Sequence, residues 1–121
     1  MKKSFLIIWF IIAANFTIKA QSLQNVLLAD SLQNAIATAA AADQPALLLQ
    51  LSKTIISLDT IRATEALNAA IIASRKHQLP AIEAEALLMQ AENYLAKGNT
   101  HQAIKSQQEA SRLYMLSLIH I

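Results

Sequence analysis

Few side chains in this sequence have the types and spacing that catalysis requires. His77 and His101 fall in segments that we predict to be turns, and neither has a metal-ligand spacing with another histidine, aspartate or glutamate. Glu83 and Glu85 are two residues apart, so on a helix they point to different faces and do not form an acid–base pair. A glycine-rich phosphate loop is excluded because Gly98 is the single glycine. We therefore predict no catalytic site, no metal site and no cofactor.

Cysteine usage and charge exclude two further classes of protein. The chain has no cysteine, so it has neither a disulfide framework nor a thiolate metal site. Three of the ten basic residues precede position 21, which leaves seven against eight acidic residues and a net charge near −1. Arg75 and Lys76 end a predicted helix and complement its dipole rather than bind phosphate. No basic surface favours nucleic acid as a partner.

The first 20 residues have the pattern of a secretory signal peptide. Lys2 and Lys3 precede an apolar run at 5–12, and Ala20 provides the small residue needed at the cleavage site. The run is shorter than the roughly 20 residues that span a bilayer. We predict cleavage after Ala20 and an exported, periplasmic protein. An uncleaved anchor, to which Trp9 would contribute, is the alternative.

The remaining chain is predicted to be helical almost throughout, because alanine and leucine dominate it. Asp43 followed by Pro45, then Asp59, Pro80, and Gly98 with Asn99, mark the helix ends. The predicted helices are 23–41, 45–57, 60–76, 80–97 and 100–114. The corresponding regions are a signal peptide at 1–20, a leading helix at 21–43, helical hairpins at 44–115 and a tail at 116–121.

An internal repeat with an offset of about forty residues organises the hairpin region. Asp59, Thr60 and Ala63 match Asn99, Thr100 and Ala103. Further matches at this offset are Leu67 with Gln107, Ala70 with Ala110, Leu47 and Leu48 with Leu87 and Leu88, and Ile55 with Leu95. A period of this size predicts stacked helical hairpins.

Residues 84–114 resemble a tetratricopeptide repeat. Leu87 stands in the tryptophan position of that family, Ala91 in the small position and Tyr94 in the aromatic position. Gly98 and Asn99 form the turn, and the small positions of the second helix hold Ala103 and Ala110. The equivalent repeat-defining residues of the first hairpin are Ala63, Leu67 and Ala70. The resemblance covers 46–114 and is closer for the second hairpin.

Three positions depart from the family pattern: Gln90 replaces a leucine, Gln107 an aromatic residue and Met115 a proline. The period also exceeds the usual 34 residues, with the extra length at 75–80. This longer linker is similar to the repeats of bacterial regulatory proteins. Another helical hairpin array or a plain bundle is the alternative.

The expected fold is all-α, with antiparallel hairpins stacked as a short tetratricopeptide-like solenoid after a signal peptide helix. The resemblance implies a concave groove lined by Glu85, Leu88, Met89 and Glu92. The alternative for Leu88 and Met89 is that they pack against the preceding hairpin.

Residues 116–121 have an unusual coding possibility. CTG TCT CTT ATA CAC ATC encodes them, and this string resembles the transposon end sequence used to tag DNA libraries. We hypothesise that the tail is an artefact and that the natural chain continues, so His120 receives no functional weight.

The sequence therefore predicts an exported, non-catalytic module that binds a protein or peptide and is the N-terminal fragment of a longer protein. The repeat region itself is expected to contact no membrane, although a downstream anchor is possible. Two alternatives remain open. The first is a periplasmic sensor region, because exported arrays of this type resemble the sensor regions of Bacteroidetes histidine kinases, and the segments 19–22 and 30–32 agree with that resemblance. The second is a small structural bundle that associates only with itself.

Overall fold

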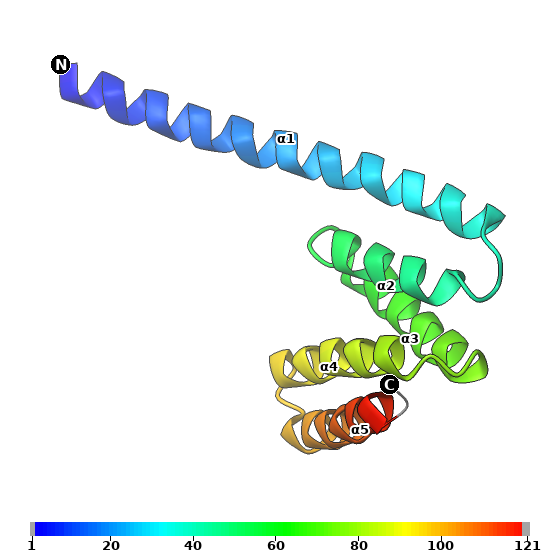
Figure 1. The fold of residues 1–121 in the computed structure, drawn as a ribbon. Helices are drawn as coiled ribbons and strands as arrows, with labels where there is room; N and C mark the ends of the chain where they lie inside the picture. The colour runs from blue at the N-terminus through cyan, green and yellow to red at the C-terminus, as the bar shows by residue number, and fades with distance from the viewer. Residues whose placement is uncertain (1, 120–121) are drawn as a thin grey trace.

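The computed structural model describes residues 2–119, with the side chains of 7–12 and 19–119. Five helices follow one another: α1 (Lys2–Thr38), α2 (Gln44–Ile55), α3 (Thr60–Lys76), α4 (Pro80–Ala96) and α5 (Thr100–Ile119). No strand occurs among residues 2–119, which confirms the all-α prediction (Figure 1).

The residues predicted to mark the helix ends account for most of the boundaries. Asp59 is a true N-cap: its Oδ1 accepts hydrogen bonds from the backbone N–H groups of Ile61 and Arg62, both at 3.1 Å. Pro45 and Pro80 stand in the first turns of α2 and α4, where no N–H group is needed. Gly98 has a φ of 80°, the left-handed conformation that ends a helix.

The local structure differs from the predictions at several of these boundaries. The side chain of Asp43 makes no capping hydrogen bond at α2. Asn99 precedes α5, but the hydrogen bonds of the described residues include its backbone carbonyl, which accepts from Ala103 N at 3.1 Å, and not its side chain. Gln78 has a φ of 55° in the α3–α4 linker, a left-handed residue that was not anticipated.

The two outer helices are longer than predicted. α1 runs without a break through the expected cleavage position at Ala20 and ends at Thr38, and α5 continues to Ile119 rather than stopping near Tyr114. Neither extension contains a glycine or a proline, the two residues that most disfavour the interior of a helix. His120 lies outside the described residues.

Each helix packs mainly on the next one along the chain. α1 contacts α2, α2 contacts α3, α3 contacts α4 and α4 contacts α5, with a smaller contact between α2 and α4. Two buried clusters result. The first joins α1, α2 and α3 through Ala29, Leu32, Leu51, Ile55, Ala63 and Ala66. The second joins α2 to α5 through Leu49, Leu67, Ala70, Ile71, Ala84, Ala86, Leu87, Ala110 and Leu113.

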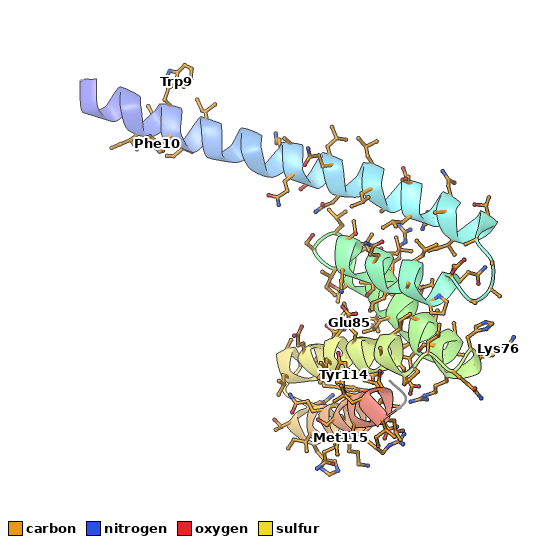
Figure 2. The ribbon with its side chains drawn as sticks, in the orientation of Figure 1. Trp9, Phe10, Lys76, Glu85, Tyr114 and Met115 are labelled. Carbon is orange, nitrogen blue, oxygen red and sulfur yellow. The ribbon has the colours of Figure 1, made fainter. Side chains whose placement is uncertain are left out.

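Only the C-terminal part of α1 belongs to this packing. Ala29, Leu32 and the partly buried Ile36 face α2. The N-terminal part projects away from the hairpins, and Trp9 and Phe10 point into open space (Figure 2). Within the described part of the chain, no helix combines the length and apolar character needed to cross a membrane.

The two hairpin turns differ by one residue, which corrects part of the predicted repeat. Asp59 N donates to Ile55 O at 2.8 Å, whereas Asn99 N donates to Tyr94 O at 2.8 Å, one residue further back. The first helices of the hairpins therefore match with an offset of 39, so that Ile55 corresponds to Tyr94. The predicted pairs Ile55–Leu95, Leu47–Leu87 and Leu48–Leu88 are wrong by one residue; accordingly Ile55 is 2% exposed and Leu95 is 50% exposed.

With this offset, Ser52 takes the position of Ala91, and both residues are buried. The Ser52 hydroxyl donates to the backbone carbonyl oxygen of Ala63 at 2.8 Å, which fixes the contact between α2 and α3. A small residue at this point lets two helices approach closely. The structure also buries Leu67, Ala70, Ala103 and Ala110 and leaves Tyr94 partly buried, whereas Gln107 is exposed.

Candidate binding groove

The four residues that the sequence assigned to a groove lie together in the structure. Glu85, Leu88, Met89 and Glu92 of α4 line one cavity of about 450 Å³. Its other lining residues are Lys53, Ile56 and Asn93. Lys53 and Ile56 come from the end of α2 and the turn after it, so the cavity lies between the first helices of the two hairpins. These two residues were not predicted from the sequence, because they precede the α4 residues of the cavity by about thirty positions.

A second cavity of about 320 Å³ continues along the same two helices. It is lined by Ala46, Leu47, Leu49, Gln50, Lys53, Ile82 and Glu85. Lys53 and Glu85 belong to both cavities. We call the two cavities together the α2–α4 groove. Figure 2 shows Glu85 between α2 and α4.

Lys53 and Glu85 form an ion pair across the groove, where the two cavities meet. Their side chains are 47% and 46% exposed. A pair this exposed contributes little to stability, because water already solvates both charges. A ligand can therefore replace either partner at small cost.

The apolar surface of the groove is divided between the interior and the solvent. Met89 is partly buried and packs on the cluster that joins α2 to α5, as the alternative interpretation expected. Leu88 is 38% exposed and remains open to the cavity. Glu92 is exposed and takes part in none of the ion pairs of the described residues. The groove thus offers aliphatic surface beside charged groups.

Glu83 and Glu85 lie on different faces of α4, as predicted. Whereas Glu85 faces α2, Glu83 faces α3 and accepts a hydrogen bond from Arg75 Nε at 2.8 Å. The Glu83 side chain is only 8% exposed, so its charge needs a partner, and the ion pair with Arg75 provides one. The sequence predicted only that Arg75 complements the helix dipole. Its pairing with Glu83 was not predicted, because it depends on how the α3–α4 linker brings Arg75 and Glu83 together.

A further cavity of about 530 Å³ lies beside this ion pair. Its lining residues are Arg75, Gln78, Leu79, Pro80, Glu83, Leu113 and Leu116. It is larger than either cavity of the α2–α4 groove taken singly, but its two lining charges are paired with each other, whereas the groove also contains Glu92, which is in none of the ion pairs of the described residues. The α2–α4 groove is therefore the better candidate for ligand binding.

In the part of the chain that the structure describes, the two remaining histidines lie apart, at the ends of different helices. His77 follows the last residue of α3, as predicted for a turn, whereas His101 is exposed in the first turn of helix α5 and not in an interhelical turn as predicted. Among the described residues, no three histidine, aspartate or glutamate side chains gather as they would around a metal ion. Arg112 donates through Nε to Glu109 at 3.2 Å, and this hydrogen bond lowers the pKa of the Glu109 carboxyl.

Comparison of the chain with protein-family models, with curated proteins and with solved structures gave no match.

Proposed function

We propose that this chain is a tetratricopeptide-type repeat segment that binds an extended peptide or protein segment in the α2–α4 groove and performs no catalysis. The observation that carries the proposal is the assembly of Glu85, Leu88, Met89 and Glu92 around one cavity. Its volume of about 450 Å³ lies within the range of about 300–1,000 Å³ that is usual for ligand pockets.

The packing order supports a stacked array over a closed bundle. In the described residues, each helix packs mainly on its neighbours in sequence, α2 also contacts α4 to a smaller extent, and α1 meets neither α4 nor α5. Nearest-neighbour contact is what a solenoid requires, because each hairpin covers the open face of the previous one. Buried small residues at Ala63, Ala91 and Ala103 agree with close helix approach within each hairpin.

The test is selection of ligands followed by removal of the groove. A library of random peptides is displayed and selected on the full chain, and the dissociation constant of the enriched peptides is measured by fluorescence anisotropy. Replacing the exposed groove residue in Leu88→Ser is expected to weaken binding about tenfold, as loss of a buried aliphatic contact does.

Ile104→Ser is the matched control, because Ile104 is an exposed aliphatic residue on α5 outside the groove. It is expected to leave binding unchanged. Equal effects of Leu88→Ser and Ile104→Ser, or a library that yields no binder, would contradict the proposed function.

We further propose that the chain is exported and cleaved after Ala20. The α1 residues that pack on α2, which are Ala29, Leu32 and Ile36, all follow this position. Cleavage therefore removes no residue of the two buried clusters. Expression in a bacterium followed by mass spectrometry of the periplasmic product tests this; a product that still begins at Met1 would contradict it.

A further inference from the structure

The charges of the α2–α4 groove are unequal. Two carboxylates, Glu85 and Glu92, face one ammonium group, Lys53. Since Lys53 pairs with Glu85, the charge of Glu92 is left without a cationic partner among the described residues. The local field of the groove therefore favours a cation.

The position of the ion pair adds geometry to this preference. Lys53 and Glu85 line both cavities, with Ile56, Leu88 and Met89 on one side and Leu47, Leu49 and Ile82 on the other. A segment lying along the groove thus meets aliphatic surface, then the charged pair, then aliphatic surface again. In an extended chain, side chains on one face recur at every second residue, about 6.6 Å apart.

We propose that the ligand of this groove is an extended segment with an aliphatic, a cationic and a second aliphatic side chain at alternate positions. The two aliphatic side chains enter the two cavities. The cation contacts Glu85 in competition with Lys53 and lies within the field of Glu92. This inference rests on the proposed function and specifies the class of partner that the groove accepts.

Competition with Lys53 has a consequence that ordinary apolar binding does not have. Removing Lys53 frees the Glu85 carboxylate for the ligand, so loss of a residue from the site should strengthen binding of a cationic segment. The same change should leave a neutral segment nearly unaffected. An exposed ion pair contributes a factor of up to about five in affinity, which sets the size of the effect.

The experiment uses three fluorescein-labelled heptapeptides, Ala-Leu-Ala-Xaa-Ala-Leu-Ala, in which Xaa is lysine, glutamine or glutamate. Dissociation constants for the full chain are measured by anisotropy at low ionic strength. We expect the lysine peptide to bind about threefold more tightly than the glutamine peptide and about tenfold more tightly than the glutamate peptide. High salt should reduce these ratios, because exposed charges are screened.

Two substitutions in the groove, each with a matched control, locate the effect. Lys53→Met is expected to lower the dissociation constant of the lysine peptide about threefold. Lys97→Met, at the far end of α4, is expected to leave this dissociation constant unchanged. Glu85→Gln is expected to abolish the preference for lysine over glutamine, whereas Glu109→Gln on α5 preserves it. All four side chains are substantially exposed, so the variants are expected to fold.

The outcomes separate the two proposals. Binding that depends on Leu88 but is as tight for the glutamate peptide as for the lysine peptide overturns the cationic ligand and leaves the groove intact. If library peptides bind but none of the three heptapeptides does, the cationic ligand is likewise overturned and the groove is retained. Absence of all Leu88-dependent binding overturns the proposed function and this inference together.

Discussion

The hydroxyl of Ser52 on α2 donates a hydrogen bond to the backbone carbonyl oxygen of Ala63 on α3 at 2.8 Å, and both residues are fully buried. This contact joins the helices of the first hairpin where they approach closely. Because the second hairpin has Ala91 at the matching place, a small side chain is the common requirement, and the hydroxyl is particular to the first hairpin.

Substitution of Ser52 separates size from hydrogen bonding. Ser52→Ala is expected to lower the free energy of unfolding by about 1 kcal/mol, through loss of one buried hydrogen bond. Ser52→Leu should cost about 3 kcal/mol or more, since added volume forces α2 and α3 apart. Urea unfolding of the full chain followed by circular dichroism measures both. Ser57→Ala in the exposed turn is the control, and a Ser52→Leu variant as stable as the wild type would contradict close approach at this point.

Gln90 links three helices. Its Oε1 accepts a hydrogen bond from the Ser106 hydroxyl of α5 at 3.2 Å, and its Nε2 donates to Asn68 Oδ1 of α3 at 3.4 Å. These two hydrogen bonds give a physical reason for a glutamine at this position. Gln90→Leu is expected to cost about 1 kcal/mol, because it leaves the Ser106 hydroxyl buried without this partner.

The double variant Gln90→Leu with Ser106→Ala should recover most of that loss, since both hydrogen-bonding groups are then removed. Urea unfolding of the two single variants and the double variant measures the coupling between the residues. Gln107→Leu, at an exposed position of α5, serves as the control. Strictly additive effects would show that the two side chains do not interact.

Substitution of Gly98 tests the backbone conformation of the turn in the second hairpin. A Cβ added there meets no atom within 4 Å, so the φ of 80° is the only obstacle to another residue. Gly98→Ala is expected to lower stability by about 1 kcal/mol, and Gly98→Asn by less, because asparagine tolerates the left-handed conformation. Thermal unfolding should show a decrease of several degrees for alanine. An unchanged midpoint would indicate that the turn adopts another conformation.

The Glu109–Arg112 pair predicts a small pH dependence of stability. The hydrogen bond from Arg112, helped by its charge, lowers the pKa of Glu109 below the ordinary 4.5, whereas burial opposes this shift. A lowered carboxyl pKa means that the pair stabilises the fold above about pH 4.5 and that this contribution is lost as the pH falls through the folded value.

The effect should be modest, because the side chain of Glu109 is 37% exposed. Between pH 7 and pH 3, the urea midpoint of the wild type is expected to fall slightly more than that of Glu109→Gln. If the variant shows the larger decrease, the direction of the shift is wrong.

The helices of this fold were predictable because their ends carry strong local signals. Asp59, Pro80 and Gly98 act within one turn of the chain, so the bounds of α3 and α4 differ from the predictions by at most one residue. Such signals do not determine how many residues close a turn. The segment from Ile55 to Asp59 is one residue shorter than the matching segment from Tyr94 to Asn99, as the hydrogen bonds that close the two turns reveal.

The groove was predictable on one side. The α4 residues Leu88 and Glu92 followed from the resemblance, since they share one helix. Their counterparts Lys53 and Ile56 depend on how the two hairpins pack, which no short-range pattern of the sequence encodes. The pairing of Arg75 with Glu83 was equally unpredictable, because it depends on the packing of α3 against α4 although only eight residues separate the two.

The most direct test of the central claim is where a selected peptide binds. The full chain is labelled at its isoleucine, leucine and methionine methyl groups and titrated with the tightest peptide from the library while methyl NMR spectra are recorded. We predict that the signals of Ile56, Leu88 and Met89 shift together, with those of Ile72 and Ile104 unmoved. Shifts confined to Ile72 and Ile104, or to Leu79 and Leu113 beside the other cavity, would contradict binding in the α2–α4 groove.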